Sequence, residues 1–485
     1  MHEQSHEHLR ELPPVGEILA AQAIGELIAQ CGRDRVRDWA REALAEVRGS
    51  LSTVSSNGET TRETLTALVL ASIQRRSVDD SSQKLGRVIN ATGVILHTGL
   101  GRAPLCPQAL TAIQDAAGAC NLEIDLASGD RRYRGYQLQS AWNRLTGAAA
   151  ALVVNNNAGA TVLALDALCR GRDVIISRGQ LIEIGGSFRL PEIFSQSGAI
   201  LREVGTTNRT SLGDYEQAIG PQTAAILRVH PSNYRVVGFA DTPATNELAN
   251  LAHRYGLACI DDIGSGCLVD TTAFGLPAEP TFQESIAAGA DLVLGSGDKL
   301  LGGPQCGILL GHQDLVDKLA RHPLARALRV DKLTLAALSA TLDVYVRGAA
   351  IQEIPTLALL AATQESLSTR AHNVQSQVAS PPLRKGGPGG VALPAPDVQL
   401  QIDVAQDNAP VGGGSLPGAE LPTATLRIKD SRLTADDLVA RLRLSSPRVF
   451  GRVHENEVVL DLRSVLPGDD QQIVAALLAL NSGKL

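Results

Sequence analysis

The sequence has no uninterrupted apolar run near the roughly 18 residues that a membrane-spanning helix requires, although 44% of its residues are hydrophobic. The first residues, MHEQSHEHLRELPP, are polar. They lack the charged segment followed by an apolar segment that is typical of a signal peptide. We therefore expect a cytoplasmic protein with no membrane partner.

Paired cysteines are also lacking. The seven cysteines are an odd number, and no two of them form a CxxC pair. This argues against a disulfide framework and against a zinc site, so we expect reduced, mostly buried thiols and no bound metal. His2, His6 and His8 are expected to belong to a solvated terminus.

An excess of positive charge is absent, because the net charge is −7. A protein that coats nucleic acid non-specifically normally presents a basic face. If RNA is a partner of this chain, its contact surface must therefore be local.

Residues 1–86 are predicted to form a helical N-terminal domain. Their apolar residues recur at spacings near three and four, and the same stretch carries interleaved charges that fit a solvated face with i,i+4 pairs. The apolar set is Ile24, Leu27, Ile28, Val36, Trp39, Leu44 and Val47, and the arginines are Arg33, Arg35, Arg37, Arg41 and Arg48.

Residues 87–345 are predicted to form a large domain in which short apolar strands alternate with helices. This alternation favours a mainly parallel sheet with helices on both faces. The strand candidates are 150–154, 173–177, 199–204, 224–230, 257–262 and 291–296.

Residues 346–485 are predicted to form a small C-terminal α/β domain after a helical connector around 333–350. Strands are expected at VQLQIDV, TATLRI, RVFGRV and EVVLDL, and helices at DDLVARLRL and QQIVAALLAL. The segment 380–396 is rich in proline and glycine and is expected to be an exposed insertion.

Three polar clusters follow strand candidates, at the position where open parallel sheets bind ligands. The first, NNNAGAT at 155–161, begins a helix. Its small residues let a ligand approach the backbone, and the helix N-terminus offers free N–H groups to a phosphate. Asn157, Ala158, Gly159 and Thr161 are the candidate contacts. An ordinary asparagine-rich helix cap explains these residues equally well.

The second cluster, CIDDIGSG at 259–266, ends an apolar strand with two carboxylates. A buried carboxylate requires a partner, and the protonated nitrogen of a pyridine ring is one such partner. Asp261 and Asp262 point to opposite faces of the strand, so only one of them can serve. A metal site and a helix cap are the alternatives.

The third cluster, SGDKLLGGPQ at 296–305, holds Lys299 on a turn between two apolar strands. Desolvation in the sheet crevice would lower the pKa of Lys299 and supply the free amine that imine formation needs. Ser296 is close enough to contact the phosphate of a cofactor bound to Lys299. A solvated surface lysine is the alternative.

The order of these clusters resembles that of the fold-type I, or aspartate-aminotransferase-like, pyridoxal-phosphate enzymes. The resemblance implies an α/β fold in which a large domain with a mainly parallel sheet binds the cofactor. A small C-terminal α/β domain and a helical N-terminal domain complete the expected architecture.

The motifs RVINATGVILHTGLGRAPL at 87–105 and SGDKLLGGPQCG at 296–307 resemble those of the bacterial L-seryl-tRNA(Sec) selenium transferases, also called selenocysteine synthases. Gln180 stands where the family motif SRGEL has Glu, and Cys306 where Ala is commoner, which leaves a hydrogen bond at residue 180 open. The matching segments are RVINATGVILHTGLGRAPL at 87–105 and those at 177–191, 203–210, 228–239, 296–307, 322–338 and 412–423.

This resemblance implies that pyridoxal 5'-phosphate forms a Schiff base with Lys299, the catalytic residue, and that seryl-tRNA(Sec) becomes selenocysteinyl-tRNA(Sec). Water is eliminated to leave an aminoacrylyl-tRNA, to which selenium from selenophosphate is added. The motif Asp-x-Gly-Ser-Gly favours Asp262 over Asp261 as the partner of the ring nitrogen. Residues 1–86 would bind tRNA, and the chain would assemble as a homo-oligomeric ring of dimers, with a decamer expected.

The same resemblance implies that Arg102, Arg326 and Arg329 bind phosphate-bearing groups through forked hydrogen bonds. Arg326 and Arg329 are three residues apart, so on a helix they share one face; helix C-terminal charge is the alternative explanation. His230 and Ser232 end a strand at the same edge and are expected cofactor contacts, although a capped turn also explains them.

Two other functions are weighed against this one. A related fold-type I lyase would act on a small amino acid or amino sugar without tRNA, but it would not need the helical region before residue 87. A non-catalytic tRNA-binding protein would not need Lys299, Asp262 and the glycine clusters.

Overall fold

The computed structural model describes residues 11–53, 61–82, 84–184, 188–379 and 400–481. The histidine-bearing terminus and the Pro/Gly-rich segment 380–396 both lie outside these ranges. The chain divides into two compact units, Met1–Arg87 and Val88–Leu485. The expected separation of a third domain at residue 346 remains a prediction.

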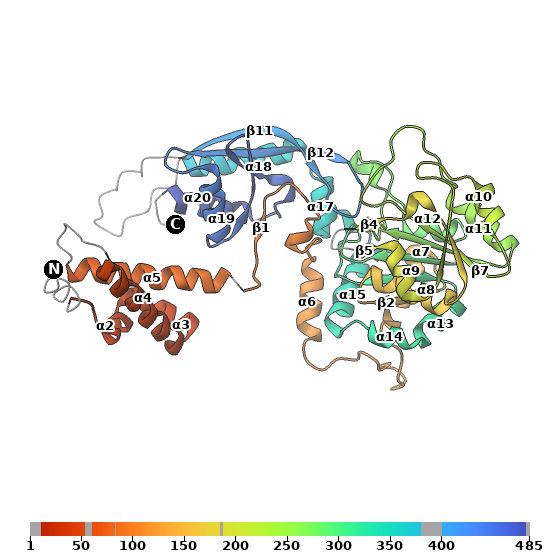
Figure 1. Ribbon diagram of the computed structural model, residues 1–485, viewed down its shortest axis with the longest axis horizontal. Helices are drawn as coiled ribbons and strands as arrows, with labels where there is room; N and C mark the ends of the chain where they lie inside the picture. The colour runs from red at the N-terminus through yellow and green to blue at the C-terminus, as the bar shows by residue number, and fades with distance from the viewer. Residues whose placement is uncertain (1–10, 54–60, 83, 185–187, 380–399, 482–485) are drawn as a thin grey trace. The chain divides into compact units, whose positions relative to one another are not determined.

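The described part of the first unit consists of four helices, α2 (Val15–Ala20), α3 (Gln22–Cys31), α4 (Arg33–Thr53) and α5 (Arg62–Ser82) (Figure 1). The helical periodicity is confirmed, because Ile24, Val36, Leu44 and Val47 are buried in one core, with α5 contributing three further residues, Leu65, Val69 and Ile73.

The charges within α4 pair differently from the expected i,i+4 pattern. Arg37 and Arg41 each pair with an aspartate three residues earlier, at N–O distances of 2.9 and 3.3 Å. Arg76 on α5 reaches across to α4, where it lies 2.8 Å from Glu42 and 3.1 Å from Glu46. The charges therefore also connect two helices, which a pattern read along one helix does not reveal.

The second unit contains a seven-stranded sheet in the order β2-β10-β9-β8-β7-β3-β6. All neighbours pair in parallel except β10, which is antiparallel to both β2 and β9. The mainly parallel prediction is confirmed. The six strand candidates correspond to β2 (Ala150–Val154), β3 (Asp173–Ser177), β6 (Ile200–Val204), β7 (Thr223–Val229), β8 (Ala258–Gly264) and β9 (Leu292–Ser296), and β10 (Gly307–Gly311) is the apolar strand expected after the turn that carries Lys299.

Helices cover both faces of this sheet because successive strand residues alternate between the faces. On β2, Ala151 and Val153 belong to one core cluster, whereas Leu152 and Val154 belong to another. Helix α8 (Asn157–Cys169) packs in the second cluster, and α7 (Gln139–Thr146) and α15 (Lys332–Val346) in the first (Figure 1).

Other helices of the large sheet region precede its strands, connect them or follow them. They are α6 (Pro107–Ala116), α9 (Leu190–Ser197), α10 (Leu212–Ala218), α11 (Thr245–Arg254), α12 (Phe282–Ala287), α13 (Gln313–Arg321), α14 (Pro323–Ala327), α16 (Ala350–Glu353) and α17 (Pro355–Ala361).

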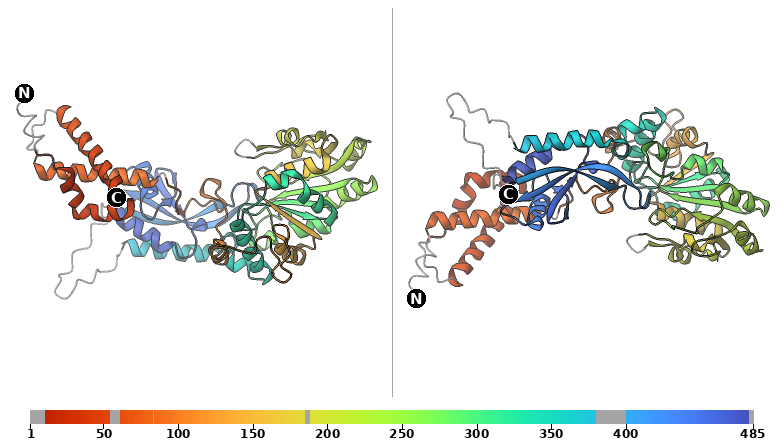
Figure 2. Two further views of the ribbon diagram at one scale, coloured as in Figure 1. Left: turned by 90° about the horizontal axis from the view of Figure 1, so that it is seen from below. Right: turned by 90° about the horizontal axis from the view of Figure 1, so that it is seen from above.

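The C-terminal residues form a four-stranded antiparallel sheet in the order β11-β12-β15-β14. These strands are β11 (Leu400–Pro410), β12 (Glu420–Asp430), β14 (Arg452–His454) and β15 (Glu457–Asp461), and α18 (Gln364–Ala379), α19 (Ala435–Leu444) and α20 (Asp470–Asn481) pack beside them (Figure 2). The predicted strand RVFGRV is divided, since β13 (Val449–Phe450) leaves this sheet to pair in parallel with β1 (Ile89–Asn90).

All seven cysteines are free, and five of them are buried, as expected. In the described ranges, no helix combines the length and apolar character that crossing a membrane requires.

Candidate functional site

Lys299 lies in a buried cavity of about 260 Å³ at the carboxyl ends of the central strands. The turn that carries it follows β9, and only 5% of the residue is exposed. Burial lowers the pKa of Lys299, and the charge of Arg102 lowers it further. The predicted desolvation of this amine is therefore present in the fold, and the solvated-lysine alternative does not hold.

Asp262 lies at the end of β8 in the wall of the same cavity. Its carboxylate accepts hydrogen bonds from the Asn157 amide at 2.8 Å, from the Thr161 hydroxyl at 3.1 Å and from the Gly264 backbone at 3.1 Å. Burial nevertheless raises the pKa of Asp262, against these hydrogen bonds and the charge of Lys299. A cation placed against this carboxyl group would keep it ionised.

Asp261 points to the opposite face of β8 and does not line the lysine cavity. Its carboxylate lies 2.9 Å from Arg228 Nη1 and accepts a 3.3 Å hydrogen bond from Thr245. The alternation of the strand therefore brings only Asp262 of the two candidates to the site.

The first cluster works both as a helix cap and as part of the cavity. The Asn156 side chain caps α8 by accepting from the Gly159 N–H at 2.8 Å, while Asn157 and Ala158 line the cavity. Gly159 is not part of the lining. The Asn157 Oδ1 atom is buried without a hydrogen-bond partner, so a ligand with an N–H or O–H group would fit there.

Four more predicted residues line this cavity: Arg102, His230, Ser232 and Ser296. Arg102 is held by Asp298, with 2.8 Å between Nη1 and Oδ2, and its backbone adopts a left-handed φ of 59°. Such a conformation is uncommon outside glycine and is tolerated where the surrounding contacts enforce it.

Asp298, Gln305 and Gly414 are among the contributors that sequence reasoning missed. Asp298 and Gln305 also line the cavity, and both lie in the motif that carries Lys299. Gly414 comes from the later GGGSLPG segment, and a Cβ there would lie 2.6 Å from Lys299 Nζ. The glycine-rich motif indicated that the chain approaches another group closely at this point. Nothing in the sequence indicated that this group is Lys299.

Gln180, where the family motif has Glu, does form a hydrogen bond. It is buried, and its Oε1 accepts a 3.1 Å hydrogen bond from the backbone of Val229, next to His230. The amide therefore supports the strand end that carries His230. Cys306 is fully buried, and burial raises its pKa beyond the ordinary range of a thiol.

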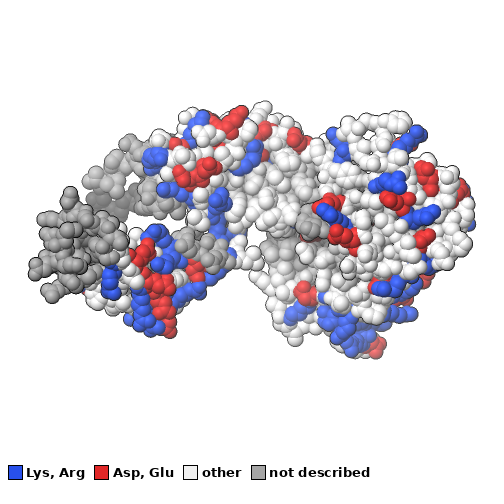
Figure 3. All heavy atoms as spheres, in the orientation of Figure 1, with Lys and Arg blue, Asp and Glu red and all other residues white. Residues whose placement is uncertain are grey.

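Arg326 and Arg329 do not line the lysine cavity. They line a separate cavity of about 450 Å³, where Arg131, Arg132 and Arg134 also lie. Lys and Arg side chains gather over this region around α14 (Figure 3). Helix α14 ends at Ala327, so Arg329 lies beyond it and the expectation of one shared helix face is wrong. Glu123 lies at the centre, 3.5 Å from Arg329, and the Arg134 and Arg131 hydrogen bonds lower its pKa to about 2.

Among the residues that the structure describes, no three His, Cys, Asp or Glu side chains are grouped so that they could hold a metal ion. The lysine cavity instead offers a buried amine, a buried acid, small-residue backbone at a helix start and several hydroxyl groups. This set fits pyridoxal phosphate.

Comparisons with known proteins agree with this chemistry. Residues 88–466 match the family described as L-seryl-tRNA selenium transferase, and residues 9–48 match the one described as selenocysteine synthase N terminal. The chain belongs to the L-seryl-tRNA selenium transferase family.

Its relatives match along nearly their whole length. The L-seryl-tRNA(Sec) selenium transferase of Moorella thermoacetica is 43% identical, over 99% of this chain and 98% of the relative. That of Carboxydothermus hydrogenoformans is 43% identical over 94% of each chain, and that of Geobacter sulfurreducens is 42% identical over 97% of this chain and 99% of the relative.

Among solved structures, a D-glucosaminate-6-phosphate ammonia-lyase matches with a TM-score of 0.56 and 21% identity, covering 82% of this chain and 96% of that chain. This likeness concerns the fold alone. Together with the family and the sheet, it confirms the predicted fold class.

The buried amine leads to a prediction about stability without cofactor. Because the pKa of Lys299 is lower in the folded protein than in the unfolded chain, the folded state binds fewer protons, and this lysine destabilises it most below its folded pKa. Lys299→Met should therefore raise the free energy of unfolding near about pH 7. The gain should shrink as the pH approaches about 10.4, the ordinary lysine pKa.

Thermal or urea unfolding across this pH range measures the effect. Lys318→Met, at an exposed position on α13, is the matched control and should show no such trend. A gain from Lys299→Met that stays constant with pH would contradict the prediction.

Proposed function

We propose that this protein converts L-seryl-tRNA(Sec) to L-selenocysteinyl-tRNA(Sec) in the cytoplasm, with pyridoxal phosphate bound at Lys299. The observation that carries the proposal is the pairing of buried Lys299 with buried Asp262 in one cavity. This pairing occurs in a chain 43% identical to a relative named for that activity.

When bound, pyridoxal phosphate supplies an electron sink for the Cα electrons of an amino acid. Asp262 would hold the proton of the ring nitrogen, and Asn157 and Thr161 keep its carboxylate oriented. The start of α8, with Ser296, would hold the phosphate. His230 and Ser232 complete the wall.

Besides binding the cofactor, Lys299 can act as a proton acceptor, because its amine is largely desolvated. Once the seryl α-amine replaces it, the free amine of Lys299 can take the Cα proton of serine and later return one. The Cα proton is thereby kept from water while the seryl hydroxyl leaves. Gly414, packed against Nζ, lets the C-terminal residues close over this amine.

Selenophosphate is the proposed selenium donor, with Arg326 and Arg329 as its ligands. Both arginines line the separate cavity that they share with Arg131, Arg132 and Arg134, which we call the basic cavity. They do not line the lysine cavity of the same chain. We propose that the chain forms a homo-oligomer, expected as a ring of dimers with ten subunits, in which the basic cavity of one copy faces the lysine cavity of another.

The alternative lyase acting on a small amino acid or amino sugar is less well supported. The matching solved lyase is 21% identical to this chain, about half the identity of the selenium transferases. The match of residues 9–48 to a selenocysteine synthase N-terminal family also supports a tRNA-binding role for residues 1–86.

The central test concerns Lys299. Lys299→Ala should abolish conversion of seryl-tRNA(Sec), while tRNA binding and the fold remain. Borohydride treatment of the wild-type protein loaded with pyridoxal phosphate should attach the cofactor to the peptide containing Lys299, which peptide mapping measures. Lys318→Ala is the control. An adduct on another lysine, or conversion by Lys299→Ala, would refute the proposal.

A second prediction concerns the first unit. Deleting residues 1–87 should leave a folded protein that binds pyridoxal phosphate, because the remaining unit has its own cores. Binding of tRNA(Sec) should fall strongly, since RNA-binding modules often recognise shape and backbone without a strongly basic surface. Filter binding measures the loss. Unchanged affinity would place the RNA site in the second unit.

A third prediction concerns the donor. Replacing both Arg326 and Arg329 with Ala should raise the selenophosphate concentration needed for half-maximal conversion by roughly a hundredfold or more, because each charge-assisted hydrogen bond contributes about 1.5–3 kcal/mol. Affinity for seryl-tRNA(Sec) should change little. Lys318→Ala, at an exposed position outside this cavity, is the control and should leave the donor dependence unchanged. Unchanged donor dependence would remove these arginines from the donor site.

A further inference from the structure

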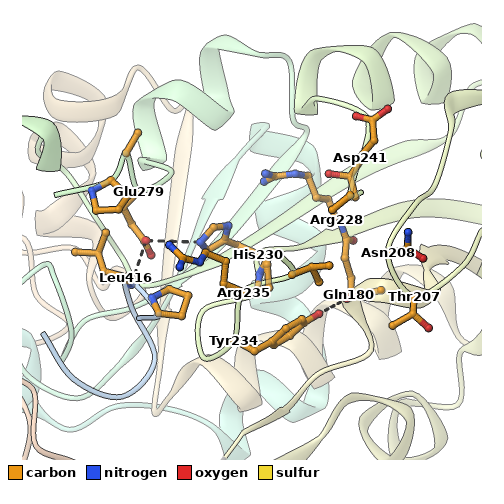
Figure 4. Close-up of a pocket in the computed structure, with 18 residues that line it drawn as sticks. Gln180, Thr207, Asn208, Arg228, His230, Tyr234, Arg235, Asp241, Glu279 and Leu416 are labelled. Carbon is orange, nitrogen blue, oxygen red and sulfur yellow. Dashed lines mark hydrogen bonds and ion pairs between the residues drawn. The ribbon is translucent and has the colours of Figure 1, made fainter. Parts of the chain in front are cut away.

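A second, larger cavity adjoins the lysine cavity. Its volume is about 550 Å³, within the range of roughly 300–1,000 Å³ that small-molecule sites occupy. His230 lines both cavities, so the two spaces meet at the end of β7. Figure 4 shows Glu279 and His230 facing one another on one side of the cavity and Arg228 and Asp241 on another.

Glu279 is the chemically unusual group in this wall. It is 5% exposed, and its Oε2 accepts a 3.3 Å hydrogen bond from the Leu416 backbone and lies 3.6 Å from His230 Nε2. Its Oε1 is buried without a hydrogen-bond partner. A buried carboxylate oxygen without a donor is destabilising, so this atom is prepared for a ligand that donates a hydrogen bond.

The cavity also contains a cation without a partner. Arg235 is exposed, and within the described residues it forms no hydrogen bond or ion pair, whereas Arg228 is held by Asp261. Beside it, the Tyr234 hydroxyl donates to the Gly179 carbonyl (Figure 4), which fixes the aromatic ring in the wall. Pro231, Val236 and Pro277 supply apolar surface.

The chemistry of the substrate requires room for a ribose next to the lysine cavity. The seryl group of an aminoacyl-tRNA is an ester of the ribose of the 3'-terminal adenosine. If its α-amine reaches Lys299, the ribose must lie just outside the lysine cavity, a few bonds away. A ribose hydroxyl donates hydrogen bonds, an adenine packs on apolar and aromatic surface, and the phosphate on its 5' side is an anion.

We propose that this cavity binds the 3'-terminal adenosine of the aminoacyl-tRNA. Glu279 accepts a hydrogen bond from the free ribose hydroxyl beside the ester, and Arg235 binds the phosphate that joins the adenosine to the preceding nucleotide. The inference rests on the proposed function, since it assumes that the amino acid arrives on tRNA.

The mixed polarity of the wall distinguishes this ligand from a simple anion. Glu279 and Asp241 both line the cavity, and two carboxylates disfavour a free phosphate. A terminal nucleotide carries both an anion and hydroxyl donors, and the wall offers both a cation, Arg235, and a carboxylate acceptor, Glu279 (Figure 4).

The experiment compares tRNA(Sec) ending in CCA with the same tRNA lacking the terminal adenosine and its 5' phosphate. With the full-length wild-type protein, shortening should weaken binding about tenfold or more, as expected for losing hydrogen bonds to charged groups. Arg235→Ala should bind the complete tRNA about tenfold more weakly, and the affinity difference between the two tRNAs should shrink by the same factor.

Glu279→Gln tests the ribose end. Glutamine must use its oxygen for the Leu416 N–H, so it presents an NH₂ group where the free Oε1 stood. We expect a loss of roughly three- to tenfold for the complete tRNA only. Thermal unfolding checks that Glu279→Gln, a change at a buried position, still folds. If it does not fold, Arg235→Ala, a change at an exposed position, tests the inference by itself. Arg202→Ala on β6, which lines neither cavity, should retain wild-type discrimination.

The outcomes separate this inference from the proposed function. Tight wild-type binding of both tRNAs with equal affinity would overturn the adenosine site while leaving the function intact. The same holds if Arg235→Ala changes the assembly state but not the discrimination, since the cavity would then be an interface between copies. A wild-type protein that binds neither tRNA would overturn the proposed function and this inference with it.

Discussion

Removal of the Lys299 amine from water is the constraint on which the rest of the site depends. A charged amine in a buried position is unfavourable, so the surrounding chain must hold it there against solvation. The turn is closed by hydrogen bonds from Leu300 N to Ser265 O, at 3.1 Å, and from Gly303 N to Gly297 O, at 2.8 Å. A side chain at Gly297 would collide with Cys306, so the turn can be this tight only with glycine.

The second requirement is that the other charges near this amine pair with one another, so that Asp262 is left without a cationic hydrogen-bond partner. Arg102 is bound to Asp298, and Asp261 is bound to Arg228 on the far face of β8. The alternation of the strand therefore gives the two adjacent carboxylates different roles: Asp261 forms an ion pair on one face, and Asp262 faces the lysine cavity on the other. Asp262 retains only neutral hydrogen-bond donors, which leaves it able to hold a cation of a ligand.

Much of this could be predicted because it is local. The alternation of β8 and the glycine-rich turn after β9 are sequence patterns with direct structural consequences, and both Lys299 and Asp262 are placed as expected. Arg326 and Arg329 were placed less well, because their cavity depends on Glu123 and on where α14 ends. Glu279 was missed entirely, since it lies in a proline-containing loop with no motif and reaches the site only through the tertiary fold.

The two cavities together explain how a chain with a net charge of −7 can take an RNA substrate. Affinity for a polyanion depends on cations that are not already paired, and many arginines of the described residues are bound to carboxylates, as Arg228 is to Asp261. An unpaired Arg235 close to the lysine cavity places one such cation where the reacting end of the tRNA must lie. Because the reacting ester is fixed to the terminal ribose, holding that nucleotide also fixes the seryl group. Binding of the terminal nucleotide therefore also orients the serine at Lys299, so that its Cα proton lies within reach of the amine.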